Sequence, residues 1–396
     1  MLRKALDGIC VLDFSQIAAG PACSMILADM GARVIKVEPP GGDLGRGLGP
    51  GWIGADSAFF HAFNRNKQGI CLDLKSEAGL AVARRLVAQA DVLVESMRPG
   101  VMARLGLGYE QLRAHHPRLI YCSISAYGQQ GPYSNRAGVD GILQADSGLM
   151  SIIGVPGAEP CKVQAPVVDV ITGHIACTGV LAKLIQRGRD GEGGHLDVSL
   201  MNCAVSLQLP SIASYLSDAV LPARIGSAAP YSAPNEAFET RDGWLMVAAY
   251  IGDRWDRLCR VLERPELIHD ERFASSRLRT ANRPALRQEL GEAFRRHCTA
   301  HWLEALLAQD ILCAKVASYE DLMTHPQLQA SGAMTSVHVC GHGAVRMPGF
   351  PINSLEENAM PHRPAPGLGE HTREVLRACA VADDRIDALM ASGAAR

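Results

Sequence analysis

Hydrophobic and polar positions in the first 125 residues alternate between two periods. Short apolar runs typical of buried strands cover residues 9–14, 33–38, 69–74, 91–95 and 118–125. Segments with apolar residues at helical spacing lie between them, at 21–30, 76–90 and 109–116. This alternation predicts a parallel α/β sheet with helices on its faces, and it places a ligand site at the loops that follow the strands.

The pattern changes beyond residue 200. Residues 236–240 and 244–250 are predicted to form a β-hairpin, because Asp242-Gly243 supplies the positive backbone angles of a tight turn. Charged helical segments follow, and the chain ends with a Pro-rich connector and a helix over 373–380. We therefore predict a large α/β domain over 1–200, a small α+β domain over 225–325 and a C-terminal return to the large domain over 330–396.

Composition narrows the function classes. The 396 residues are 47% hydrophobic and 20% charged, enough apolar material for a full core, and the net charge of −2 indicates neither a nucleic-acid partner nor a membrane surface. The twelve cysteines form no Cys-x-x-Cys pair, which is typical of reduced thiols. Acidic residues interrupt the apolar N-terminus, and no segment is judged long enough to span a membrane, so we expect a cytoplasmic protein.

Several common motifs are missing. The first turn, Ala18-Ala19-Gly20-Pro21, lacks the Gly-x-Gly-x-x-Gly pattern of a dinucleotide site, and we find no Walker loop and no Gly-x-Ser-x-Gly elbow. A strand over 337–345 would bring His338, Cys340 and His342 to one face. A surface strand with incidental histidines is the favoured interpretation, so no metal is predicted.

Asp169 is the strongest candidate for chemistry. It lies where an apolar segment becomes a long amphipathic helix, which continues to about Arg187. A carboxylate at a helix start faces unpaired N–H groups and the positive end of the helix dipole, so we expect it to stay ionised, as a nucleophile requires. A plain helix cap is the other interpretation of the same position.

Basic residues gather in the α/β part of the chain. Those at or just beyond predicted strand ends are Lys36, Arg46, Arg65, Lys67, Lys75, Arg98 and Arg104. As a group they indicate a phosphate-bearing substrate such as a CoA thioester, whereas solvated surface charge is the favoured interpretation of any one of them alone.

Eight segments in order along the chain form a specific set: 11–15, 20–23, 31–38, 64–67, 72–75, 99–100, 193–200 and 367–372. Among them are Gly31-Ala32-Arg33-Val34-Ile35-Lys36-Val37-Glu38 and Gly193-Gly194-His195-Leu196-Asp197-Val198. Together they resemble the class III CoA-transferases, which include formyl-CoA transferase and carnitine CoA-transferase. The resemblance implies a doubly wound, Rossmann-like large domain, a smaller α+β domain and an interlocked homodimer.

The resemblance also implies roles for individual residues. Asp169 matches the nucleophilic aspartate, which forms an aspartyl anhydride and then an aspartyl-CoA thioester. Gln16 and Asp140 match positions that assist it. The residues implied to bind CoA are Ile17, Ala18, Ala19, Leu72, Asp73, Leu74, Lys75, Ser96, Met97, Arg98 and Arg104. CoA thioesters are substrates here, and no permanently bound cofactor is expected.

Two departures bear on the acceptor. Pro39 stands where formyl-CoA transferases have a basic residue, and the glycine-rich loop over their oxalate site is replaced by residues 226–231. We therefore expect a small dicarboxylate acceptor, such as malate, citramalate, mesaconate or itaconate, with succinyl-CoA or acetyl-CoA as donor. Arg46, Arg65 and Arg224 are candidate partners for the second carboxylate, although binding of CoA phosphates or a surface position is an equal alternative.

Alpha-methylacyl-CoA racemases are the alternative within the same fold. Their pattern has His before Asp in a Gly-His-Asp motif, and this chain has Gly138-Val139-Asp140. Valine cannot act as a base, so racemisation is the minor interpretation. A CoA-binding protein without catalysis would lack the carboxylate that is present at 169.

Overall fold

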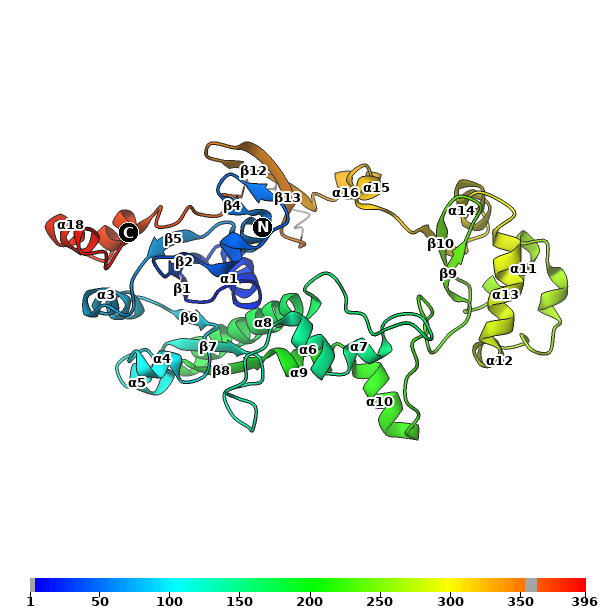
Figure 1. Ribbon diagram of the computed structural model, residues 1–396, viewed down its shortest axis with the longest axis horizontal. Helices are drawn as coiled ribbons and strands as arrows, with labels where there is room; N and C mark the ends of the chain where they lie inside the picture. The colour runs from blue at the N-terminus through cyan, green and yellow to red at the C-terminus, as the bar shows by residue number, and fades with distance from the viewer. Residues whose placement is uncertain (1–3, 353–361) are drawn as a thin grey trace. The chain divides into compact units, whose positions relative to one another are not determined.

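The computed structural model describes residues 4–352 and 362–396 (Figure 1). The chain divides into two compact units, which are described separately. Unit 1 comprises residues 1–149, 162–220 and 327–396, and unit 2 comprises 150–161 and 221–326. The segment 150–161, which the sequence placed in the first domain, packs with unit 2.

A six-stranded parallel sheet forms the centre of unit 1. Its strands, in spatial order, are β5 (Gln68–Cys71), β2 (Arg33–Glu38), β1 (Cys10–Asp13), β6 (Val92–Glu95), β7 (Ile120–Ser125) and β8 (Gly194–Ser199). Every neighbouring pair is parallel. The strand order reverses its direction between β1 and β6, and such a switch point is where ligands bind in open α/β sheets.

Helices cover both faces of this sheet. The helices of unit 1 are α1 (Ala19–Asp29), α2 (Ala58–Asn64), α3 (Glu77–Val87), α4 (Val101–Arg104), α5 (Tyr109–Arg113), α6 (Asp140–Asp146), α8 (Val167–Asp190), α9 (Leu200–Ser206), α10 (Leu209–Asp218), α17 (Thr372–Ala378) and α18 (Asp383–Ala391). The paired helices α1 and α8 pack on one face. Apolar side chains of α3, α4, α5, α17 and α18 fill a buried core on the other.

The C-terminal segment returns to the edge of the sheet beside β5. Asp73 N–H donates to the carbonyl of Ala394, and Arg396 N–H donates to that of Cys71. A hairpin of β12 (Met334–Val339) and β13 (Gly343–Pro348) precedes this return. Shorter elements of unit 1 are η2 (Leu44–Gly47), β3 (Trp52–Ile53) and β4 (Asp56–Ser57), and α7 (Leu149–Ile152) and α16 (Pro326–Ala330) lie at the unit boundaries.

Unit 2 packs helices against a small antiparallel sheet. Its strands are β11 (Leu312–Lys315), β10 (Trp244–Ala248) and β9 (Asn235–Glu239), in that order. Its helices are α11 (Arg254–Val261), η3 (Pro265–Ile268), α12 (Ser276–Ala281), α13 (Arg283–Phe294), α14 (Thr299–Leu307) and α15 (Tyr319–Met323). In its core Phe238 stacks on Phe294, and Trp302 meets Phe294 edge to face and donates its indole N–H to the carbonyl of Phe294.

The structure confirms the predicted parallel α/β sheet and the β9–β10 hairpin. Two expectations are wrong. Residues 337–345 are not one strand, because Cys340 and His342 lie in the turn between β12 and β13. Within the described residues, α8 is long and apolar enough to cross a membrane by length and composition. A single helix of this kind is weak evidence for a span, and this one packs along α1.

Candidate functional site

A cavity of about 270 Å³ opens at the carboxyl ends of β1 and β6, at the switch point. Its walls include Gln16, Ala18 and Ala19 after β1, Ser96 and Met97 after β6, and the side chain of Asp169. A larger pocket of about 580 Å³ adjoins it and shares Phe14, Gln16 and Met97. The fold therefore brings Asp169 and the predicted CoA-binding turns to one place.

Asp169 lies in the first turn of α8, whose cap comes from another helix. Asp140, the first residue of α6, accepts the backbone N–H of Val168 at 2.8 Å and that of Asp169 at 3.2 Å on the same carboxylate oxygen. Gln144 donates to the other oxygen at 2.5 Å, and its amide also makes two hydrogen bonds to the backbone of Val163. Asp140 is thus fixed in place as the external cap of α8.

This cap changes the electrostatics of the site. The N–H groups that we expected to stabilise the ionised Asp169 are occupied by a second carboxylate. Burial, followed by the negative charge of Asp140, raises the pKa of Asp169 to about 7. The expectation of a firmly ionised side chain is wrong, because a helix start stabilises a carboxylate only where its N–H groups and dipole are not already compensated.

The first turn of α1 lies on the same cavity and has no such cap. Ala18 is its N-cap, no side chain caps it, and its first turn contains no acidic residue. The turn before it is strained, since Ile17 has a φ of +70° in a region that β-branched residues rarely adopt. An uncapped helix start presents N–H groups without intrahelical acceptors, so it suits a developing negative charge.

Close packing fixes these two helix starts relative to one another. Gly173 lies one turn beyond Asp169, and a Cβ there would be 2.6 Å from the Cβ of Ala22 and 2.8 Å from the carbonyl oxygen of Ala19. Only glycine permits this approach of α8 to α1.

The predicted CoA-binding residues fall into two groups. Those placed on the two cavities are Ile17, Ala18, Ala19, Leu72, Asp73, Leu74, Lys75, Ser96 and Met97, with the assisting residue Gln16 beside them. Arg98 lines two smaller pockets beside Ser96, and exposed Arg104 ends α4 and lines none of these pockets. The structure brings nine of the predicted CoA-binding residues together and leaves Arg104 outside.

Four of the basic residues predicted to bind a polyanion form ion pairs inside the protein instead. Lys36 pairs with Asp43 at 2.6 Å, Lys67 with Asp13 at 2.9 Å, Arg65 with Asp29 at 2.5 Å and Arg46 with Glu38 at 2.7 Å. All are buried, so their predicted role in phosphate binding, and that of Arg46 and Arg65 in acceptor binding, is wrong. Charge near a strand end does not reveal whether a carboxylate lies opposite it.

Arg224 belongs to unit 2, where its guanidinium donates to the carbonyl of Ala158.

Sequence reasoning missed two ionisable residues near the cavity. Arg136, half exposed, lies with Arg98 on a pocket of about 150 Å³ that shares Ser96 and Gly138 with the cavity of Asp169. Glu95 ends β6, and burial raises its pKa to about 7. The signal for Arg136 was its place two residues before Gly138, in the same stretch as Asp140.

Neither the histidine of the racemase pair, on the cavity of Asp169, nor a metal cluster is found in the part of the chain that the structure describes. The cavity of Asp169 is lined by no histidine, and Val139 stands beside Asp140. No group of three His, Cys, Asp or Glu side chains in residues 4–352 and 362–396 is arranged for a metal ion.

A family model described as CoA-transferase family III matches residues 6–372. The chain belongs to CoA-transferase family III. A succinyl-CoA:glutarate CoA-transferase of Mus musculus is 36% identical over 392 residues, covering 98% of this chain and 90% of the mouse protein. A succinate–glutarate CoA-transferase of Agrobacterium fabrum is 38% identical over 383 residues, covering 94% and 95%.

A solved structure of a CAIB/BAIF family protein from Brucella suis matches with a TM-score of 0.84 and 34% identity, covering 94% of this chain and 98% of that one. These findings confirm the resemblance, the mixed α/β fold with a large parallel sheet and the assignment of the chain as a CoA-transferase. The racemase alternative is not favoured.

Proposed function

We propose that this CoA-transferase moves CoA from an acyl-CoA thioester to a small dicarboxylic acid, with Asp169 as the nucleophile. One observation carries the mechanism: Asp169 lines a cavity together with residues of the uncapped first turn of α1. A nucleophile and a set of backbone N–H groups facing one cavity is the arrangement that acyl transfer requires.

The chemistry proceeds through two covalent states of Asp169. Its ionised carboxylate attacks the thioester carbonyl, and the C–S bond breaks to give a mixed anhydride and CoA thiolate. The thiolate then attacks the aspartyl carbonyl, releasing the donor as a free carboxylate and leaving an aspartyl-CoA thioester. The acceptor carboxylate reverses the sequence, so the thioester energy is retained without hydrolysis.

N–H groups at the start of α1 stabilise the oxyanion of each step. Ala18 and Ala19 line the cavity, and a preorganised donor of this kind contributes about 10²–10³-fold to a rate. The side chain of Gln16 lines both cavities, so it lies between the nucleophile and the larger pocket. That position supports its assisting role.

The larger pocket is the proposed CoA site. It is formed by residues 72–75 on one side and by Met97 and Val101 on the other. Lys75 is exposed at its rim, where a phosphate would meet it in solvent. Its volume of about 580 Å³ lies in the range of small-molecule pockets.

The acceptor assignment rests on relatives and on one arginine. The mouse and Agrobacterium relatives are named as glutarate CoA-transferases, and glutarate is a C5 dicarboxylate. Arg46 and Arg65 are held in buried ion pairs, whereas Arg136 is half exposed and lies 3.9 Å from its partner Asp146. We therefore assign the distal carboxylate to Arg136, whose pocket shares Ser96 and Gly138 with that of Asp169. Guanidinium binds a carboxylate bidentately.

An interlocked homodimer completes the proposal. Helix α10 contains no buried residue, and Leu209 and Leu216 are 66% and 76% exposed. An apolar surface of this kind is typical of an interface between subunits. It supports dimerisation through this helix.

A substrate screen tests the function. The purified protein is incubated with succinyl-CoA and each of glutarate, malate, citramalate, mesaconate and itaconate, and new thioesters are read by mass spectrometry. We expect at least one dicarboxylyl-CoA to form with little free CoA released. A clear preference for carnitine or aryl monocarboxylates would reject the acceptor assignment, and proton exchange next to the thioester without transfer would reject the reaction.

A further inference from the structure

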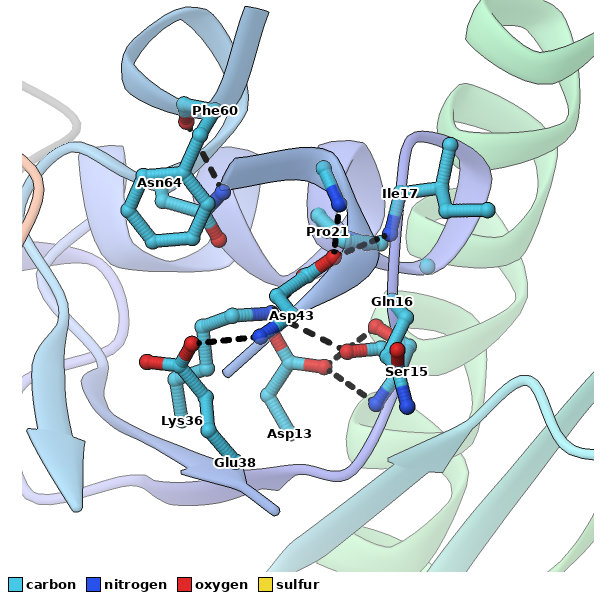
Figure 2. Close-up of polar contacts among 12 residues, drawn as sticks. Asp13, Ser15, Gln16, Ile17, Pro21, Lys36, Glu38, Asp43, Phe60 and Asn64 are labelled. Atoms are coloured by element: carbon cyan, nitrogen blue, oxygen red, sulfur yellow. Dashed lines mark hydrogen bonds and ion pairs between the residues drawn. The ribbon is translucent and has the colours of Figure 1, made fainter. Parts of the chain in front are cut away.

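Four fully buried charges lie beneath the turn Ser15–Ala18, and neither the CoA-binding residues nor the nucleophile account for them. We name Asp13, Lys36, Asp43 and Lys67 the buried charge cluster; none of their side chains is exposed to solvent. Figure 2 shows three of its members, Asp13, Lys36 and Asp43, beside the turn. Two positive and two negative side chains balance, so the cluster carries no net charge.

One pair holds the strained residue of the turn. Asp43 accepts the backbone N–H of Ile17 at 3.0 Å and that of Gly45 at 2.7 Å. Its other oxygen lies 2.6 Å from Lys36 Nζ, and the same ammonium donates to the carbonyl of Ser15 at 3.0 Å. The Lys36–Asp43 pair therefore binds the backbone of the residue before Gln16 and of the residue after it (Figure 2).

The other pair holds the two ends of the turn. Asp13 accepts the backbone N–H of Ser15 at 2.9 Å and the hydroxyl of Ser24 at 2.6 Å. Lys67 donates to Asp13 at 2.9 Å and to the carbonyl of Pro21 in the first turn of α1 at 3.0 Å. Burial alone would raise the pKa of Asp13, but Lys67, Lys36 and the serine hydroxyls bring it well below its usual range.

Ser96 adds a contact from β6, since its hydroxyl accepts the N–H of Gln16 at 3.0 Å. Backbone groups of Ser15, Gln16 and Ile17 thus all make hydrogen bonds to side chains within the protein. The next N–H groups, at Ala18 and Ala19, belong to the start of α1 on the cavity wall. A left-handed Ile17 persists only when its surroundings enforce it, and the buried charge cluster does so.

We propose that Lys36 and Asp43 are positioning residues for CoA transfer, holding Ile17 in its left-handed conformation so that the N–H groups of Ala18 and Ala19 face the reacting carbonyl. This inference rests on the proposed function, because the oxyanion that those groups meet arises in the acyl-transfer steps. Neither Lys36 nor Asp43 touches the substrate.

The test variant is Asp43→Asn, with Asp29→Asn as its matched control. Both replace a fully buried carboxylate paired with a cation, but Asp29 ends α1, ten residues beyond its start. In Asp43→Asn an amide faces the Lys36 ammonium in place of a carboxylate, and the turn loosens. We expect kcat to fall by about 100-fold with the KM for the acyl-CoA changed less than about threefold, the loss that a misplacement of the donors by about 1 Å produces.

Rates are expressed per active enzyme, counted by mass spectrometry of the covalent CoA adduct, so partial unfolding does not imitate the effect. The double variant Ile17→Gly/Asp43→Asn should recover about tenfold of the lost kcat, because glycine adopts a positive φ without steric cost. A role in stability alone would lower the melting temperatures of both carboxylate variants and give no such recovery.

Equal kcat in Asp43→Asn and Asp29→Asn, or no recovery in the double variant, overturns the positioning role. Transfer that survives in Asp169→Ala would instead reject the proposed function, and the positioning role with it. The two failures are therefore distinguishable.

Discussion

Two helix starts meet at the cavity, and they differ in what satisfies their N–H groups. At α8 the carboxylate of Asp140 accepts the first N–H groups, whereas at α1 no side chain caps the helix and Ala18 and Ala19 line the cavity. The same backbone feature therefore has two electrostatic outcomes. The capped start raises the proton affinity of a neighbouring carboxylate, and the uncapped start favours negative charge.

This difference fits the two roles that acyl transfer requires, a nucleophile and a set of hydrogen-bond donors for the oxyanion. A carboxylate with a pKa near 7 is a stronger nucleophile than one near 4, provided that enough of it is ionised. The oxyanion, by contrast, needs donors that no internal acceptor has taken. Burial, followed by the charge of Asp140, thus suits Asp169 to the proposed role of nucleophile, and the uncapped α1 start is the one proposed for the oxyanion.

Removing the nucleophile gives the largest expected effect. Asp169→Asn should lower kcat by about 10⁴-fold or more, because the amide cannot form the anhydride. Binding of CoA and the fold should persist, since Asp169 is only partly exposed on the cavity wall and is not part of the packed core. Transfer assays, a thermal melt and calorimetric CoA titration measure the three quantities. Asp190→Asn, at the exposed end of the same helix, is the control, and transfer retained by Asp169→Asn would refute the mechanism.

A substitution that forces the starts of α1 and α8 apart should have the second-largest effect. Gly173→Ala places a Cβ 2.6 Å from that of Ala22, so α8 must move from α1. We expect a loss of about 1–3 kcal/mol in unfolding free energy and about 10–100-fold in kcat, since overpacking is destabilising and the nucleophile shifts from the donors.

The matched control is Gly188→Ala on the same helix, where a Cβ would meet nothing within 4 Å. There alanine should be neutral or stabilising by up to about 1 kcal/mol. Chemical denaturation and steady-state rates of both variants provide the comparison. A fully active and stable Gly173→Ala protein would show that close contact of the helices is not needed.

The sequence predicted much of this architecture because its signals are local. The apolar runs around β1, β2, β6 and β7 are short and bounded by turn residues, so period and length identified them. The position of Asp169 at a helix start was visible in the same way. β11 and α18 were missed, because a four-residue strand with a mostly exposed surface and a short charged helix have little periodic signal.

The electrostatics of the site could not be predicted, because each pairing is long-range. Asp140 reaches α8 from 28 residues away, and Lys67 reaches Asp13 from 54. Nothing local distinguishes buried Lys67 from exposed Lys75, although one lies in an ion pair and the other at the rim of a pocket. The family resemblance indicated Asp169 as the candidate nucleophile, but the ionic partners became visible only in three dimensions.

Removing the charge of Asp140, the cap of α8, should have a smaller effect, namely a shift in the pH dependence of kcat/KM. Asp169 must be ionised to attack, so kcat/KM for the donor should rise with pH and level off above about 7. Asp140→Asn removes the second cause of the raised pKa and leaves burial, so the rising limb should move about one unit toward lower pH.

Asparagine can still accept the N–H groups of Val168 and Asp169, so the helix start should remain. Asp146→Asn on the same helix, where the carboxylate accepts the Tyr127 hydroxyl, is the control and should leave the limb in place. A pH profile of kcat/KM for all three proteins decides the matter. An unmoved limb in Asp140→Asn would mean that burial alone sets the pKa of Asp169.

The smallest expected effect concerns the acceptor. If Arg136 holds the distal carboxylate, Arg136→Met should raise the KM for a dicarboxylate about tenfold and leave that of the acyl-CoA donor nearly unchanged, the loss expected for one charge-assisted hydrogen bond in a half-exposed place. A monocarboxylate of equal length, which has no second anion, should bind the two proteins alike. Two-substrate kinetics with glutarate and valerate separate these cases, because only the dicarboxylate distinguishes Arg136 from methionine. An equal increase for both acids, or an increase for the donor alone, would assign Arg136 to packing or to the CoA phosphates and leave the two helix starts as the whole of the reacting site.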